Sequence, residues 1–174
     1  MTSIKTLILS TVVLFLGSVF VFESLLLQKE NKQRGPASYT LYTPGIKARS
    51  KKMMEEARRL HVIEDYKSAN VTLSKLLDQY PYTGYREEAS FLLAKGLFYE
   101  GKYGRSEEVI QLLKEHDPGT NSKWLGYALL VQGKIHEIRG EVDDSIRLYR
   151  YVIKEFSDTD LVNEAEDILI EVSP

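Results

Sequence analysis

The sequence predicts an all-α protein, in which one N-terminal membrane-spanning helix precedes an α-solenoid of three helix pairs and a terminal capping helix. Three observations support this fold class. An apolar run of 22 residues stands near the N-terminus. Beyond residue 50, apolar residues keep helical spacing, and glycine or proline interrupts them at regular intervals. Three stretches of 25 residues then align without a gap, which is the signature of a repeat.

Composition limits the possible functions. Of the 174 residues, 43% are apolar and 28% are charged, with a net charge of −2. Residues 1–50 hold six basic and two acidic side chains, so the other 17 basic and 23 acidic side chains lie in residues 51–174. Such an acidic region without a basic stripe argues against nucleic acid as a partner. The chain has no cysteine, which excludes disulfides, thiolate metal sites and lipid attachment through cysteine.

Residues 1–5 form a short tail, and residues 6–27, TLILSTVVLFLGSVFVFESLLL, predict a transmembrane anchor. A helix of this length reaches about 33 Å, and a bilayer core is about 30 Å thick. Glu23 stands near the end of the run, where its carboxylate can reach the interface. The alternative is a cleaved signal peptide, but the run lacks a small-x-small cleavage pattern, so we favour a retained anchor.

The orientation of the anchor stays open. Basic residues are more frequent after the anchor than before it, which favours a cytoplasmic C-terminal domain. A very short N-terminus followed at once by a long apolar run instead favours export. Residues 28–49 contain Gly35-Pro36 and Pro44-Gly45 without periodicity and predict a linker. Its SYTLYT segment is either an extended contact for a partner or part of a solvated tether, and we favour the tether.

The repeat occupies residues 57–81, 94–118 and 133–157. Equivalent positions carry small residues (Ala57, Ala94, Gly133), aromatic or apolar residues (Tyr66, Tyr103, Val142), small residues again (Ala69, Ser106, Ser145) and large residues (Leu73, Ile110, Tyr149; Leu76, Leu113, Val152). Each stretch therefore predicts two closely packed antiparallel helices, and the aromatic or apolar residue after the turn is expected to fill the gap between them. Gly101 and Gly140 suit the left-handed residue at the turn, where Glu64 departs from the pattern. Pro81 and Pro118 are expected to stop the second helices.

These features predict seven helices after the linker. The expected ranges are 50–63, 66–79, 85–100, 103–116, 122–139, 142–156 and 160–172. In the last of them, Ala165, Ile168, Leu169 and Val172 share one face. An end repeat needs a cover with a polar outer face, so this segment is expected to be the capping helix. The whole repeat domain is expected to span residues 50–174.

The pattern resembles the tetratricopeptide repeat over residues 50–172, with spacings of 37 and 39 residues where that family has about 34. The turns KLLDQYPYTGYREEA (75–89) and YVIKEFSDTDLVNEA (151–165) also match each other. This turn is similar to those of bacterial envelope members of the family, in the style of the BamD, Tol–Pal-associated and YfgM families. The resemblance implies a right-handed solenoid whose first helices line a concave groove that binds other proteins.

When the groove positions of the family are carried over to this sequence, the resemblance places a set of residues in that groove. The set comprises Arg58, His61, Phe91, Lys95, Phe98, Tyr99, Tyr127, Lys134 and Glu137, with Met54 and Leu130 beside them. Arg58, Lys95 and Lys134 share one repeat position and are expected to form a basic ladder. Such a ladder suits an extended peptide that carries carboxylates. The alternative is that the aromatic residues are core and the three cations are solvated.

No motif for catalysis, a metal or a cofactor stands in the sequence. His61, His116 and His136 are scattered, and phosphate-binding loops and nucleophile elbows are absent. The acidic pairs Glu87-Glu88, Glu107-Glu108 and Asp143-Asp144 each fall in the first turn of an expected helix, where they complement the helix dipole. We therefore expect no enzyme activity, no cofactor and no small-molecule substrate.

The expected function is that of a membrane-anchored protein–protein interaction module, a scaffold or accessory subunit of a membrane or envelope complex. The alternative is a transient peptide-binding adaptor or chaperone-like factor that uses the groove. The expected partners are other proteins, and the membrane through residues 6–27, with no nucleic acid. The expected location is the bacterial inner membrane, single-pass, with the repeat domain in the periplasm; a cytoplasmic repeat domain is the alternative.

Overall fold

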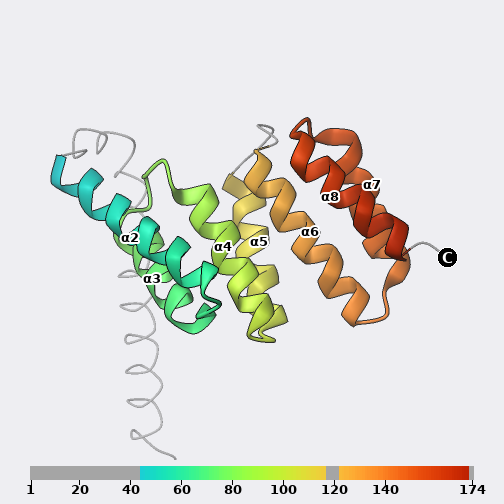
Figure 1. The fold of residues 1–174 in the computed structure, drawn as a ribbon, viewed down its shortest axis with the longest axis horizontal. Coiled ribbons are helices and arrows are strands. Elements are labelled where there is room, and N and C mark those ends of the chain that lie inside the picture. Colours follow the sequence, from blue (N-terminus) through green and yellow to red (C-terminus); the bar gives the residue numbers. More distant parts are fainter. Residues whose placement is uncertain (1–43, 117–121, 173–174) are drawn as a thin grey trace, which may run out of the picture. The chain divides into compact units, whose positions relative to one another are not determined.

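A computed structural model of the chain describes residues 44–116 and 122–172, and these are all-α, without a strand. Seven helices follow one another in Figure 1: α2 (Pro44–Val62), α3 (Tyr66–Gln79), α4 (Arg86–Tyr99), α5 (Tyr103–His116), α6 (Lys123–Ile138), α7 (Val142–Glu155) and α8 (Thr159–Val172). The expected tail, anchor and most of the linker lie outside the described residues. Among the described helices, none combines the length and apolarity needed to cross a bilayer.

Six of the seven helices agree with the sequence-based ranges to within one residue at each end. The exception is α2, which begins at Pro44, so residues 44–49 are helical and the prediction that they belong to the linker is wrong. Proline is favoured in the first turn of a helix, where its missing N–H needs no partner. The added residues are largely exposed and continue into the folded domain at Ser50, which is buried and whose hydroxyl donates to the Lys47 carbonyl at 3.1 Å.

Each helix pair turns through the same hydrogen-bonded motif. At Gly101, φ is +71°, its N–H bonds the Phe98 carbonyl, and the next N–H bonds the Leu97 carbonyl, both at 2.9 Å. The turn at Gly140 repeats this pattern with φ of +77°. Glu64 also repeats it, with φ of +59° and its N–H bonded to the His61 carbonyl. All three are Schellman caps, so the first pair keeps the repeat geometry without the glycine.

Replacing Glu64 with glycine is therefore expected to stabilise the protein by about 0.5–1 kcal/mol. The left-handed conformation costs a residue with a Cβ about 1–2 kcal/mol, and the greater freedom of glycine in the unfolded chain offsets part of that gain. Urea denaturation of the full-length protein measures the change. The matched control is Glu64→Ala, which removes the same carboxylate and keeps the Cβ; a glycine variant no more stable than this control would contradict the prediction.

Burial follows the repeat register. The small and large positions that the alignment matched are fully or almost fully buried in all three pairs, namely Ala57, Ala94, Ala69, Ser106, Ser145, Leu73, Ile110, Tyr149, Leu76, Leu113 and Val152. The position after the turn differs, because Tyr66 and Tyr103 are half-buried and Val142 is 42% exposed. The expectation that this residue fills the gap between the paired helices is wrong for Val142.

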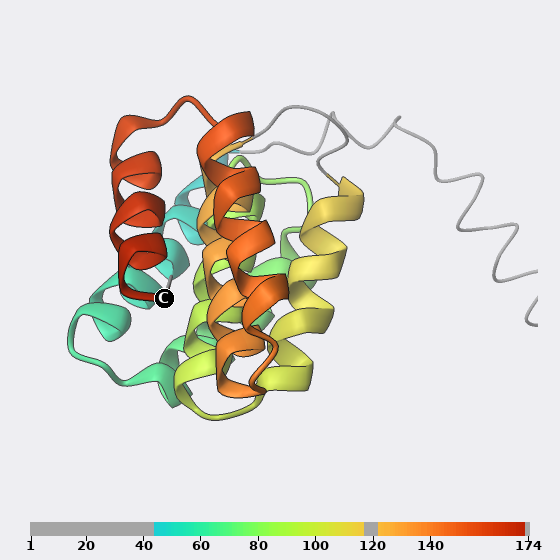
Figure 2. The ribbon, with the colours of Figure 1, turned by 90° about the vertical axis from the view of Figure 1, so that its right-hand side faces the viewer.

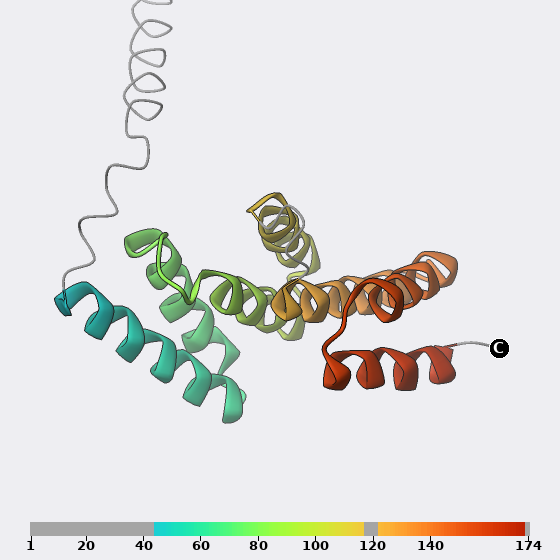
Figure 3. The ribbon, with the colours of Figure 1, turned by 90° about the horizontal axis from the view of Figure 1, so that it is seen from above.

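The pairs α2–α3, α4–α5 and α6–α7 stack in sequence order, and α8 packs on α6 and α7. Figure 2 shows α7 and α8 side by side. Seen from above, α5 lies on one side of the row that α4 and α6 form, and α2 and α8 lie on the other (Figure 3). The first and second pairs meet mainly through α3 and α4, whereas the second and third pairs meet mainly through their first helices, α4 and α6. This repeat-like arrangement leaves the facing sides of α4 and α6 to form the site described next.

Candidate functional site

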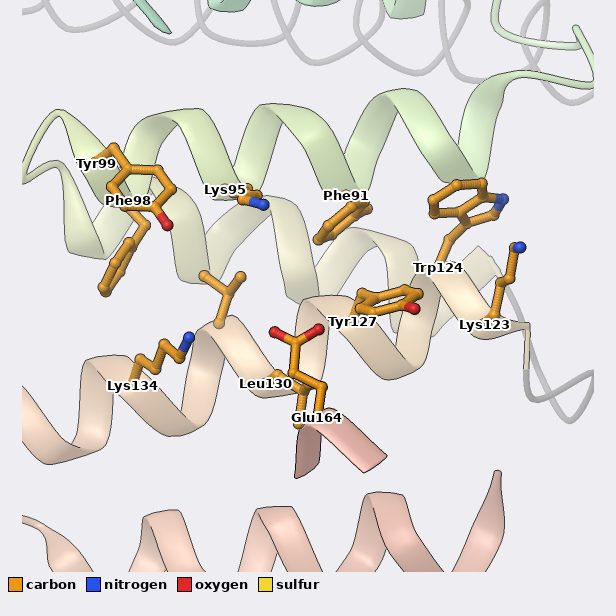
Figure 4. A pocket seen from close by; sticks show the side chains of 11 residues that line it. Phe91, Lys95, Phe98, Tyr99, Lys123, Trp124, Tyr127, Leu130, Lys134 and Glu164 are labelled. Carbon is orange, nitrogen blue, oxygen red and sulfur yellow. The ribbon is translucent and has the colours of Figure 1, made fainter. Parts of the chain in front are cut away.

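A cavity of about 320 Å³ lies between α4 and α6, with α8 at its edge (Figure 4). We call it the α4–α6 groove. The lining residues come from three helices: Phe91, Lys95, Phe98 and Tyr99 of α4, Lys123, Trp124, Tyr127, Leu130, Val131 and Lys134 of α6, and Glu164 of α8. The lining is therefore aromatic and apolar with three cations and one carboxylate.

Lys95 and Lys134 face the space between the two helices from opposite sides (Figure 4). They are the only half-buried lysines among the residues that the structure describes; the other described lysines are exposed. In this described part of the chain, no carboxylate forms an ion pair with either of them. Two half-buried cations thus face the groove, and Glu164, the one carboxylate among its lining residues, forms no ion pair with either of them.

One end of the groove is a cluster of three rings. The Phe91 ring centre lies 5.8 Å from that of Trp124 and 5.6 Å from that of Tyr127, and the latter two rings are 6.3 Å apart. Phe91 is largely buried, whereas Trp124 and Tyr127 are half-buried. The ammonium of Lys95 lies 5.9 Å from the Phe91 ring centre. This ring cluster therefore stands directly beside Lys95.

The opposite end carries a second aromatic group. Phe98 packs edge-on against Tyr99 at 5.4 Å between ring centres, and Tyr99 stacks on Tyr66 of α3 at 4.7 Å. Tyr99 remains 52% exposed. The lysine pair thus lies between two aromatic ends, and Tyr99 is the lining residue on α4 that solvent reaches most easily.

The rim near the ring cluster is acidic. Burial raises the pKa of Tyr127, and the nearby carboxylates Asp158, Glu164 and Asp160 raise it further. Lys123, at this end of the groove, lies 3.9 Å from Asp158 and 5.1 Å from the Trp124 ring centre. The charge of this lysine is therefore partly compensated, and the uncompensated positive charge concentrates at Lys95 and Lys134.

The structure brings together six of the nine groove residues expected from the sequence: Phe91, Lys95, Phe98, Tyr99, Tyr127 and Lys134. Arg58 lies outside the groove, because its guanidinium donates two hydrogen bonds, at 2.7 and 2.6 Å, to the carboxylate of Glu88 on α4. The basic ladder is consequently a pair of lysines. Met54, placed beside the ladder by sequence, is fully buried in the core of the first pairs.

Glu137 and His61 also lie outside this cavity. The carboxylate of Glu137 accepts a hydrogen bond from the hydroxyl of the buried Tyr149, so it belongs to the packing of α6 on α7. His61 packs edge-on against Tyr66 at 5.4 Å between ring centres. Burial lowers the pKa of His61, and the charge of Lys95 lowers it further, which favours the neutral imidazole next to the groove.

Sequence reasoning did not place Lys123, Trp124, Val131 or Glu164 in the groove. Trp124 and Lys123 stand near the start of the helix, nine and ten residues before the aligned stretch that begins at Gly133, and no groove residue was carried over from that far upstream. Val131 lies one turn before Lys134 on the same helix, a spacing that would have indicated a shared face. Glu164 comes from α8, and only the docking of that helix on α6 and α7 brings it to the rim.

Glu87-Glu88 and Asp143-Asp144 lie in the first turn of a helix as expected, but the expectation is wrong for Glu107-Glu108, which lie beyond the first turn of α5. Glu88 binds Arg58, and Glu107 accepts two hydrogen bonds from Arg139 at 2.6 Å, so each joins two helices. The α6–α7 turn also brings potential ligand atoms of His136, Glu141 and Asp144 within 4.8 Å of one another, a proximity that sequence reasoning missed. His136 already bonds Glu141 at 2.5 Å, and Asp144 already pairs with Arg147.

The fold and the groove define an all-α domain of helical repeat-like architecture with a mixed aromatic and cationic cavity. No protein-family model matches the chain, and no curated protein matches it. The geometry of the groove is therefore the basis for the functional argument that follows.

Proposed function

We propose that the protein is a membrane-anchored interaction module of the tetratricopeptide repeat type, a scaffold or accessory subunit of a membrane complex, and that the α4–α6 groove binds its protein partner. The observation that carries this proposal is the pair of half-buried lysines between aromatic ends, neither of which has a carboxylate partner among the described residues. The three matching Schellman turns and the stacked helix pairs support the repeat type. The right-handed solenoid and the anchor at residues 6–27 are part of the same proposal.

The alternative within this proposal is a transient peptide-binding adaptor or chaperone-like factor. A subunit and an adaptor use the same groove and differ in how long the partner stays. We place the domain on the periplasmic side of a bacterial inner membrane, because its inter-repeat turns resemble those of envelope proteins.

Site-specific photocrosslinking in native membranes tests the groove. A photoreactive phenylalanine derivative at the position of Tyr99 is expected to capture a discrete protein partner. The same group at the position of Leu112 is the matched control, because Leu112 is 54% exposed, close to the 52% of Tyr99, and lies on α5. Equal capture from both positions, or no capture from Tyr99, would contradict the proposed role of the groove.

Exchange of residues 6–27 for an unrelated transmembrane helix distinguishes a stable subunit of a complex from a transient adaptor. If the crosslink from the Tyr99 position persists after the exchange, the protein acts as an adaptor, and its anchor serves only to keep the repeat domain at the membrane. If the crosslink is lost while the protein remains in the membrane, packing of the anchor against other helices holds it in a complex.

A further inference from the structure

The electrostatic state of the groove points to an anionic occupant. Lys95 and Lys134 are half-buried, face one space, and have no carboxylate partner within the described residues. Other cations of the domain, such as Arg58 and Arg139, are neutralised by bidentate contacts to Glu88 and Glu107. A carboxylate between the two lysines would form charge-assisted hydrogen bonds with both, which are about twice as strong as neutral ones.

The spacing beside the lysine pair indicates what accompanies the carboxylate. The Lys95 ammonium lies 5.9 Å from the Phe91 ring centre, and Phe91 joins Trp124 and Tyr127 in the ring cluster. In an extended segment, side chains two residues apart lie on the same face, about 6.5 Å from each other. A segment with its carboxylate at the lysine pair therefore presents the side chain two residues away to the ring cluster.

The acidic rim restricts the arrangement further. Asp158 and Glu164 lie at the ring-cluster end, and they would repel a second carboxylate there. The half-buried rings instead favour an apolar or aromatic side chain, which gains by leaving water. The two neighbouring positions thus select opposite chemistries, one anionic and one apolar.

We infer that the α4–α6 groove recognises an extended segment of a partner protein in which an aspartate or glutamate stands two residues from a bulky apolar residue. The carboxylate lies between Lys95 and Lys134, and the apolar side chain packs on the ring cluster of Phe91, Trp124 and Tyr127. This inference rests on the proposed function, that the groove binds a protein, and adds the kind of segment that it binds.

Selection from a displayed library of random twelve-residue peptides, with the full-length protein in detergent micelles as target, tests the inference. The enriched sequences are expected to share the acidic-x-apolar spacing or its reverse, apolar-x-acidic. The most enriched sequence is then made as a peptide, together with a counterpart that carries asparagine or glutamine in place of the acid. Trp124 is the only tryptophan of the chain and lines the groove, so its fluorescence reports binding directly.

We expect the amide counterpart to bind about tenfold more weakly or worse, because a hydrogen bond to a charged group contributes about 1.5–3 kcal/mol. The double variant Lys95→Gln/Lys134→Gln should show a loss of the same size for the acidic peptide. The matched control is Lys67→Gln/Lys114→Gln, which removes two exposed lysines from α3 and α5 and should bind as the unchanged protein does.

Three results would overturn the inference: a selection that enriches no sequence, enriched sequences without the acid, or equal binding of the acidic and amide peptides. With each of these results, the photocrosslinking experiment still decides whether the groove binds a protein at all. Capture of a partner from the Tyr99 position together with any of these results would mean that the groove binds a protein by another chemistry. Loss of that capture as well would remove the proposed function itself.

Discussion

Replacing Tyr149 with alanine is expected to lower the free energy of unfolding by about 3–5 kcal/mol, the range for removing a large buried aromatic side chain. Tyr149 is fully buried on α7, and its hydroxyl donates to Glu137 of α6. The substitution therefore leaves a cavity between the helices of the third pair and removes the partner of a half-buried carboxylate. Urea denaturation of the full-length protein, followed by circular dichroism, measures the loss.

The ring of Tyr149 also explains why Gly133 occupies the equivalent position of Ala57 and Ala94. A methyl group at Gly133 would lie 2.6 Å from the ring carbon Cζ, which is too close without movement of the buried ring. Gly133→Ala alone should thus destabilise by about 1–3 kcal/mol. In the Tyr149→Ala background the same change should be neutral or stabilise by up to about 1 kcal/mol, because the overlap is gone and alanine favours a helix. A cost of the same sign and size in both backgrounds would show that the ring does not exclude the methyl group.

Leu161→Ala is expected to cost about 2–5 kcal/mol and to loosen α8. Leu161 is fully buried, and its side chain occupies the space beside Gly126, where a methyl group would overlap it. It is therefore a main anchor of the terminal helix on α6. The loss should appear in the free energy of unfolding and in faster amide hydrogen exchange along α8 than along α4.

Ile170→Ala is the matched control for this prediction, because it removes apolar atoms from the same helix at a position that is 76% exposed. Its effect should stay within about 0.5 kcal/mol. If Leu161→Ala were as mild as this control, α8 would be held by its half-buried residues, such as Ile168 and Leu169, and the burial of Leu161 would contribute little.

Local sequence patterns were sufficient for the helices. The spacing of apolar residues and the positions of Gly101, Gly140 and Pro81 predicted six of seven helices to within a residue, because the start and end of a helix depend on nearby side chains and turn conformations. The start of α2 was missed because proline followed by glycine is common both in turns and at the beginning of a helix. Glu64 was read as a departure from the pattern, but the packing of α2 on α3 holds it in the left-handed conformation.

The groove was only partly predictable. Repeat position put Phe91, Lys95 and Lys134 on one surface, and all three line the α4–α6 groove, because equivalent positions of stacked helix pairs point to the same side of the stack. It gave no place to Trp124 and Glu164, which lie outside the three aligned stretches. Repeat position also could not distinguish Arg58 from the two lysines, because all three occupy the same position of the repeat.

By itself, the sequence determined the all-α class, the order of the helices, the bounds of six of the seven described ones to within a residue, and the register in which small and large residues meet. Only the tertiary structure decided which charges remain available. Arg58 is neutralised by Glu88 thirty residues away, and Glu137 is engaged by Tyr149, whereas Lys95 and Lys134 face each other across the groove without a partner carboxylate in the described residues. The reason is physical: helix formation depends on neighbours in sequence, while the compensation of a charge depends on which side chains folding brings within a few ångströms.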